Sequence, residues 1–166
     1  MQDARPKLSS AVHHIGLTVK DLQRSIDFYV LLGAELVSQA ADFHGPVADR
    51  ILALTDAHFD SALLRMPAGD YLELLAFQNP VGTRLRFNPS NPAASHIGFL
   101  VDDIAETYRR LHAIGIEFNS EPQEILEGPM EGMKFVYARD PDGAILELVE
   151  RPNNDFDGML GGRPRG

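Results

Sequence analysis

The chain has 166 residues, 44% of them hydrophobic, which is enough for one compact domain or two small, tightly associated modules with a proper core. The formal net charge of −9 argues against nucleic acid and anionic membranes as partners, because both would require a basic face. There is no cysteine, so disulfides, thiolate metal sites and cysteine nucleophiles are excluded, and any metal must be held by His, Asp or Glu.

The first half of the chain is predicted to form a strand, a helix and three further strands. Residues 12–19 are expected to form the first strand, and Asp21 and Gly33 suit the N-cap and the C′ position of the helix that follows. The later strands are predicted at AELVSQ, DSALLRM and DYLELLAF, with the turn MPAGD between the last two.

The second half repeats this order. A strand at 95–101 precedes a helix with Asp103 as its N-cap, Glu106 in a capping box and Gly115 at C′. Three strands follow at IEFN, MKFVYARD and AILELVER, with DPDGA as the last turn. Two pairs of segments align between the halves. The first pair, without a gap, is HHIGLTVKDLQRSIDFYVLLGAEL with SHIGFLVDDIAETYRRLHAIGIEF, and the second is PAGDYLEL with PDGAILEL. The expected fold class is therefore α+β, with two βαβββ modules.

Composition divides the chain into five segments. The modules are expected at 11–78 and 95–151, joined by a linker at 79–94 that is rich in Pro, Asn and Ser. Residues 1–10 and 152–166 are expected to be flexible tails. The first residues lack the apolar core of a signal peptide, and no stretch reaches the ~20 apolar residues of a membrane span, so a cytoplasmic location is expected.

Strand alternation selects the candidate site residues. In the first strand Ile15, Leu17 and Val19 are expected to face the helix, so that His14 points to the other face and His13 is structural. The same alternation singles out His96 in the second module and one glutamate in each last strand. A glutamate among apolar neighbours in a central strand is costly to bury unless it is paired or bound to a cation.

The repeat therefore predicts one metal site with two neutral nitrogens and two carboxylates. Its ligands are expected to meet in one concave cleft, and they are His14, Glu73, His96 and Glu147. This donor set suits a single divalent ion, namely Ni²⁺, Co²⁺, Zn²⁺, Mn²⁺ or Fe²⁺. Phe43, Met130, Met133 and Tyr137 are expected to line the cleft or to pack in the core, and His44 and His58 are candidates for substrate contact in a variable loop.

The motifs HIGLTVKDLQRSIDFY, PAGDYLELL, SHIGFLVDDI and DPDGAILELVE resemble those of the vicinal oxygen chelate superfamily, over residues 11–151. That superfamily includes glyoxalase I, methylmalonyl-CoA epimerase, extradiol dioxygenases, fosfomycin resistance enzymes and bleomycin resistance proteins. The resemblance implies a glyoxalase-like cleft in a curved mixed sheet. It also implies metal ligands at the four positions named above, in the order of bacterial glyoxalase I; the epimerases have glutamine at the position of Glu73.

The function that the resemblance implies is that of a divalent-metal-dependent lyase or isomerase of the glyoxalase I-like type. Such an enzyme abstracts a proton next to a metal-bound carbonyl of a small-molecule substrate, and here Glu147 is the first candidate for the base and Glu73 the second. The segment FHGPVADRILALTDAHF does not resemble glyoxalase I, so the substrate stays open.

Two other functions remain open from the same resemblance. The first is an iron-dependent dioxygenase, and the second is a small-molecule-binding protein of the bleomycin-resistance type. A homodimer with a small-molecule substrate is expected, without nucleic acid or membrane as partner.

Overall fold

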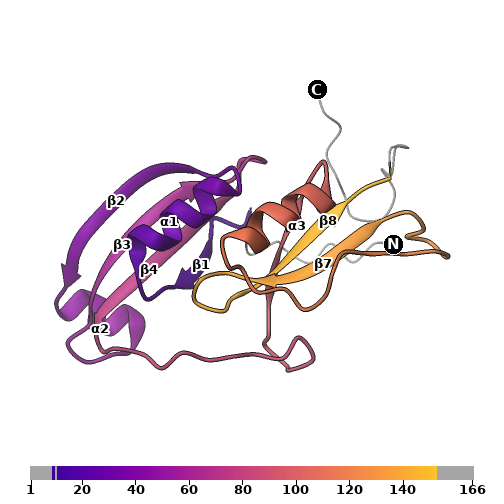
Figure 1. The fold of residues 1–166 in the computed structure, drawn as a ribbon. Coiled ribbons are helices and arrows are strands. Elements are labelled where there is room, and N and C mark those ends of the chain that lie inside the picture. Colours follow the sequence, from indigo (N-terminus) through magenta and orange to yellow (C-terminus); the bar gives the residue numbers. More distant parts are fainter. Residues whose placement is uncertain (1–8, 10, 153–166) are drawn as a thin grey trace, which may run out of the picture. The chain divides into compact units, whose positions relative to one another are not determined.

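A computed structural model describes residues 9 and 11–152 of the chain (Figure 1). Apart from Ser9 and Pro152, the two expected tails lie outside these described residues. The chain divides into two compact units, Met1–Thr83 and Arg84–Gly166. The boundary between the units falls within the segment that was expected to be a linker.

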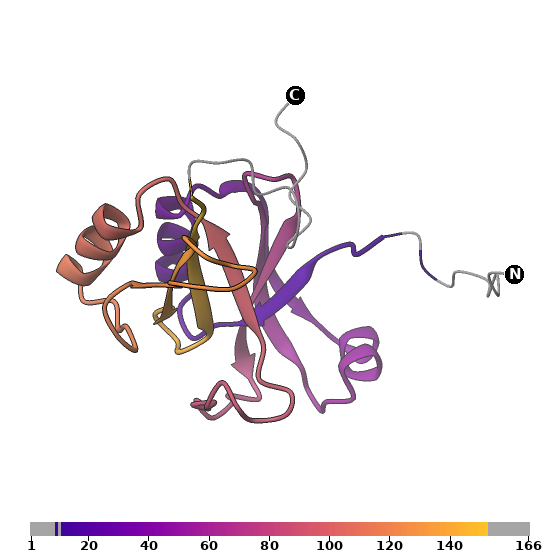
Figure 2. The same cartoon turned by 90° about the vertical axis from the view of Figure 1, so that its right-hand side faces the viewer.

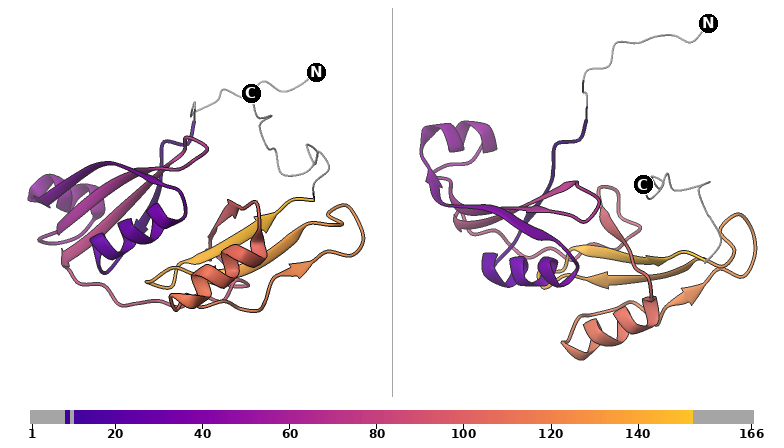
Figure 3. Two further views of the ribbon diagram at one scale, coloured as in Figure 1. Left: turned by 45° about the horizontal axis from the view of Figure 1, so that its top comes forward. Right: turned by 90° about the horizontal axis from the view of Figure 1, so that it is seen from above.

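The first unit is a four-stranded sheet with two helices. Its elements are β1 (Ile15–Thr18), α1 (Leu22–Leu31), β2 (Glu35–His44), α2 (Pro46–Leu52), β3 (His58–Arg65) and β4 (Tyr71–Asn79). The strand order is β1-β4-β3-β2, in which only the β1–β4 pair is parallel. Helix α1 lies along one face of this sheet (Figure 3), and α2 stands on the opposite side (Figure 2).

The second unit repeats this topology without the second helix. Its elements are β5 (His96–Leu100), α3 (Ile104–Ala113), β6 (Gln123–Glu124), β7 (Lys134–Arg139) and β8 (Ile145–Glu150). The order β5-β8-β7-β6 matches that of the first sheet, again with the first and last strands parallel. The α+β class and the duplicated unit predicted from the sequence are confirmed.

Both long helices begin and end at the predicted residues. Asp21 accepts a hydrogen bond from the Arg24 N–H at 3.0 Å, and Asp103 accepts one from the Glu106 N–H at 2.9 Å. Beyond the helix ends, Gly33 has φ 95° and fills the left-handed C′ position. These helices have ten residues each, and no helix in the described part of the chain is long and apolar enough to cross a membrane.

The same tight turn joins the last two strands of each unit. The Met66 N–H bonds to the Asp70 carbonyl at 2.8 Å, and the Asp140 N–H bonds to the Ala144 carbonyl at 3.0 Å. Each turn holds a glycine at positive φ, which glycine tolerates without steric cost. Because a tight turn sets the register of its hairpin, the two hairpins place equivalent residues opposite each other.

Strand alternation separates a buried face from an accessible one in β4, where Leu72 and Leu74 are buried and Glu73 between them is partly exposed. In β8 Leu146 and Leu148 are buried on either side of the partly exposed Glu147, but Ile145 and Val149, on the face of Glu147, are buried as well. The edge strand β1 follows this pattern less strictly, because its Ile15 is 47% exposed.

Two features differ from the prediction. Helix α2 was not predicted; it starts at Pro46, a residue suited to the first helical position, and buries Ala48 against Phe59 of β3. The predicted strand IEFN was wrong, since it forms only one bridge, from Phe118 to Ala138, and the strand beside β7 is the unpredicted β6. The Ile116 N–H bonds to the Leu111 carbonyl at 3.1 Å at the end of α3, but this bond does not account for the missing strand, because the equivalent Ala34 N–H bonds to the Tyr29 carbonyl at 3.0 Å in the first unit, where β2 forms.

Glu150 connects the last strand of the second unit to the start of α3. Its carboxylate accepts hydrogen bonds from the Ile104 N–H and the Lys134 ammonium, both at 2.7 Å. Burial raises the pKa of the Glu150 carboxyl, but these two donors outweigh it and the net pKa is lowered. The ion pair thus stabilises the unit only while Glu150 is ionised.

We predict that Glu150→Gln lowers the free energy of unfolding at pH 7 by about 1 kcal/mol, the usual cost of losing an acceptor at a helix N-terminus. Because the folded pKa is lowered, the contribution of Glu150 is present above the unfolded pKa and disappears as the pH falls below about 4. Urea unfolding of both proteins between pH 7 and pH 3 measures this, with Glu127→Gln in an exposed loop as control. A penalty that is equal at both pH values would contradict the prediction.

Candidate functional site

The first unit holds one of the predicted histidine and glutamate pairs. His14 lies directly before β1, and its Nε2 is 3.2 Å from Oε2 of Glu73 in β4. In the parallel β1–β4 pair Gly16 is opposite Glu73. A Cβ on Gly16 would lie 4.0 Å from Glu73 Oε2, so the carboxylate fills the space that a side chain longer than alanine would need.

The second unit holds the equivalent pair. His96 in β5 and Glu147 in β8 approach with Nε2 and Oε2 3.5 Å apart. Gly98 is opposite Glu147, and a Cβ on it would lie 3.8 Å from the same oxygen. The structure therefore brings His14 to Glu73 and His96 to Glu147, one pair in each unit. The paired glycines were not singled out from the sequence as site residues, although they occupy equivalent positions of the repeat.

Each pair has the chemistry and spacing of two ligands on one cation. Nitrogen and oxygen ligands lie at roughly 2.0–2.2 Å from ions such as Zn²⁺, which places neighbouring ligands about 3.0–3.5 Å apart. The observed nitrogen–oxygen distances of 3.2 and 3.5 Å match this spacing. All four side chains retain some exposure, so an ion can reach them. The donors present therefore fit a divalent metal.

The His13 ring contacts the imidazole of His14. The Nδ1 atoms of His13 and His14 are 2.7 Å apart, so one ring donates a hydrogen bond to the other. The two rings meet edge to face, with centroids 5.1 Å apart. This hydrogen bond fixes the orientation of the His14 ring. When His14 Nδ1 is the donor, its Nε2 carries the lone pair that can bind a metal. The structural role expected for His13 thus has a definite partner.

Tyr137 distinguishes the second pair from the first. It lies opposite Glu147 in the β7–β8 hairpin, whereas the equivalent position opposite Glu73 is Leu63. Its ring meets that of His96 edge to face, with centroids 5.4 Å apart. Burial, the negative charge of Glu147 and the hydrogen bond to Glu147 all raise the pKa of the Tyr137 hydroxyl. This contact follows from the register of a tight-turn hairpin, which was the signal available in the sequence.

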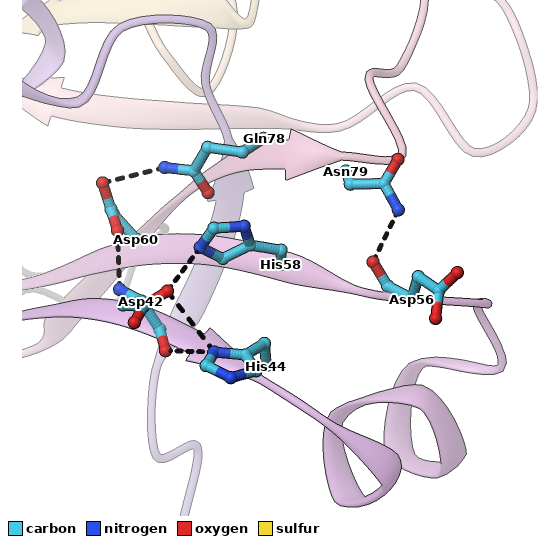
Figure 4. Close-up of polar contacts among 7 residues, drawn as sticks. All are labelled: Asp42, His44, Asp56, His58, Asp60, Gln78 and Asn79. Atoms are coloured by element: carbon cyan, nitrogen blue, oxygen red, sulfur yellow. Dashed lines mark hydrogen bonds and ion pairs between the residues drawn. The ribbon is translucent and has the colours of Figure 1, made fainter.

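The other residues expected near the cleft have different surroundings. Met133 is completely buried and belongs to the core of the second unit. Phe43 is half exposed and packs on Phe59, with ring centroids 5.1 Å apart. His44 and His58 join Asp42 in a separate polar cluster at the end of β2 and β3 (Figure 4). Asp42 was not selected from the sequence.

Known proteins resemble this chain over most of its length. A family model described as the Glyoxalase/Bleomycin resistance protein/Dioxygenase superfamily matches residues 11–148. A 2-epi-5-epi-valiolone epimerase from Actinomyces sp is 32% identical over 146 residues, which covers 86% of this chain and 80% of that protein. The uncharacterized protein YwkD of Bacillus subtilis is 28% identical, over 87% of this chain and 99% of its own.

Solved structures share the fold. A glyoxalase family protein from Bacillus cereus superimposes with a TM-score of 0.74 at 22% identity, covering 90% of this chain and 98% of that one. The fosfomycin resistance protein FosX from Listeria monocytogenes, complexed with Mn(II) and sulfate, gives a TM-score of 0.57 at 21% identity, covering 88% and 96%. At these identities the likeness concerns the fold alone.

We predict that the Tyr137 hydroxyl titrates above its ordinary range and that Glu147→Gln lowers its pKa, because the variant removes the negative charge beside it. Nuclear magnetic resonance of tyrosines labelled at Cζ measures this titration, with Tyr137→Phe to assign the signal. Glu121→Gln, an exposed carboxylate of the same unit, is the control that leaves the value unchanged. The same titration in the parent chain and in Glu147→Gln would refute the contact.

Proposed function

We propose that this chain is a divalent-metal-dependent isomerase or lyase acting on a small carbonyl compound. The chain belongs to the Glyoxalase/Bleomycin resistance protein/Dioxygenase superfamily, and this membership is the first reason for the proposal. The observation that supports the proposal most directly is the duplicated pair of histidine and glutamate, with nearly the same spacing in both units. A chance polar contact would not be expected twice at equivalent positions, each with a glycine opposite the glutamate.

In this proposal one divalent ion is held by His14, Glu73, His96 and Glu147. The support is the donor chemistry of each pair, since an imidazole nitrogen and a carboxylate oxygen suit Zn²⁺, Ni²⁺, Co²⁺, Mn²⁺ or Fe²⁺. Either the two pairs of one chain or pairs from two chains would complete the set. The FosX relative in fold is complexed with Mn(II), which is consistent with metal binding in this fold.

The chain's own residues would then move the proton. A bound divalent cation would supply Lewis-acid stabilisation of negative charge at a substrate carbonyl. The carboxylate of Glu147 would accept the proton from the carbon next to that carbonyl and return it, so that no electrons are lost to an oxidant. Tyr137 would orient this carboxylate through their hydrogen bond. Glu73, which is more exposed and faces Leu63, is the second candidate for the base.

An isomerase is favoured over a lyase by the Actinomyces relative, which bears the name of an epimerase and is matched over 86% of this chain. An epimerase removes a proton at a stereocentre and delivers one to the opposite face, so with Glu147 as the base a second group must act as the acid there, and Glu73 is the candidate for it. The departing C–H electron pair moves toward the carbonyl oxygen and comes back when the proton returns. The four ligand candidates are the same for both reactions.

The metal assignment predicts that His14→Ala and His96→Ala each lower the metal content of the chain purified without chelator by about one equivalent. The reason is that each variant removes one of the two neutral nitrogens of the proposed set. Elemental analysis by mass spectrometry measures this content, and His112→Ala, on the exposed side of α3, is the matched control. The assignment fails if His96→Ala and the parent chain contain equal amounts of metal.

The reaction predicts metal-dependent exchange of a substrate C–H proton with D₂O. The screen uses glutathione hemithioacetals, acyl-CoA thioesters, hydroxy- and ketoacids and cyclic hydroxyketones, with Ni²⁺, Co²⁺, Zn²⁺ and Mn²⁺ supplied separately. We expect Glu147→Gln to lower the exchange rate by about a hundredfold or more, as for loss of a general base, and Glu127→Gln to leave it unchanged. Metal content is measured beside each rate, because Glu147→Gln also removes a ligand.

Two outcomes would overturn this function. Turnover that requires Fe²⁺ and consumes dioxygen would identify a dioxygenase. Tight ligand binding without turnover under every metal would identify a small-molecule-binding protein.

A further inference from the structure

A second group of side chains of metal-ligating types lies in the first unit, where β2 ends and β3 begins. It shares no residue with the histidine and glutamate pairs. His44 is the last residue of β2 and His58 is the first residue of β3, and they lie opposite each other in the register. Asp42 precedes His44 by two residues. Figure 4 shows the three side chains pointing toward one another.

The distances within this cluster suit a shared cation. Asp42 Oδ1 is 2.8 Å from His58 Nε2 and 3.4 Å from His44 Nδ1, and His44 Nδ1 also donates a hydrogen bond to the Asp42 main-chain carbonyl at 2.8 Å, which an ion would replace. One ligand atom from each residue lies within 4.8 Å of the other two. Neighbouring ligands of one Zn²⁺ ion are about 3.0–3.5 Å apart, so binding requires the His44 ring to leave the Asp42 carbonyl and rotate toward the ion.

The backbone holds Asp42 in place for this role. The β2–β3 register shifts between Ala40 and Phe43, and Asp42 has φ 62°, a conformation that non-glycine residues seldom adopt. Its N–H donates to Asp60 Oδ1 at 2.8 Å, and Asp60 Oδ2 accepts from Gln78 at 2.8 Å. Asp42 is thus held by Asp60 of β3, and Asp60 is held in turn by Gln78 of β4.

The surroundings favour a cation over an anion. The cluster borders a shallow pocket of about 420 Å³, whose eight lining residues include Asp49 and Asp56 in addition to Asp42, and no lysine or arginine. The side chains of Asp42 and His44 are largely exposed, and that of His58 is partly exposed, so an ion has direct access. One carboxylate and two imidazoles with an open side leave room for water at the remaining coordination position.

We propose that Asp42, His44 and His58 bind one Zn²⁺ ion that fastens the two ends of the α2 insertion. The insertion leaves the sheet after His44 and returns to it at His58, so a metal bound by both histidines closes this loop. Two nitrogens and one oxygen suit Zn²⁺ or a cation of similar preference. This site is independent of the proposed reaction, because it shares no residue with the two histidine and glutamate pairs.

The test uses the tag-free, full-length chain with His14→Ala and His96→Ala, a background that lacks the histidines of the proposed catalytic site. After removal of metal with a chelator, Zn²⁺ is titrated by calorimetry, and thermal unfolding is followed with and without Zn²⁺. We expect about one equivalent of Zn²⁺ to bind and to raise the melting temperature. Adding His58→Gln should weaken binding at least tenfold and abolish the thermal shift.

Asp42→Asn keeps the size of the side chain but removes its charge, so it separates metal binding from folding. It should weaken Zn²⁺ binding while the circular dichroism spectrum stays that of the background. His112→Gln, on α3, is the control that keeps one equivalent. The proposal is overturned if the background binds no Zn²⁺. It is also overturned if His58→Gln and Asp42→Asn change the melting temperature but not the affinity for Zn²⁺, because the cluster would then only join the two strand ends by hydrogen bonds.

Discussion

The parallel pairing of the first and last strand is the constraint on which each unit depends. Two parallel neighbours cannot be joined by a tight turn, so the chain has to cross over through a helix and return through an antiparallel hairpin. In both units one further main-chain hydrogen bond extends the parallel pair beyond the end of its first strand. The Val19 N–H donates to the Leu75 carbonyl, and the Val101 N–H donates to the Val149 carbonyl. The helix, the hairpin and the polar pair all follow from this one arrangement.

This pairing also explains why a glycine stands opposite each glutamate. The carboxylate of Glu73 has to pass over the neighbouring strand to reach His14, and Gly16 leaves that space free. Gly98 does the same for Glu147. Each pair is therefore complete within its own unit, and its geometry needs no contribution from the rest of the chain.

The two units use the same frame with different surroundings. Tyr137 lies opposite Glu147, where the first unit has the apolar Leu63 opposite Glu73. The first unit instead carries α2, whose packing brings Phe77 and Leu75, on the same strand face as Glu73, against Phe59. The two equivalent carboxylates thus have different neighbours, and Glu73 is the more exposed of the two.

The sequence by itself determined the elements that depend on short-range physics. Helix caps at Asp21 and Asp103, the C′ residue Gly33 and the two tight turns are local, because each involves residues only a few positions apart. Strand alternation then assigned His14 and Glu73, and their equivalents, to one face of each sheet. Tyr137 was within reach of the same reasoning, since the turn sets its register.

Only the tertiary structure decided the contacts that depend on irregular or long-range pairing. The bulge that joins Asp42 to His44 and His58 lies at the far end of a hairpin interrupted by α2, where no tight turn sets the register. The edge strand of the second sheet is likewise not IEFN but Gln123–Glu124, which pairs with β7 across a loop instead of a tight turn. In both cases no tight turn sets the register, so the pairing depends on packing across the whole unit.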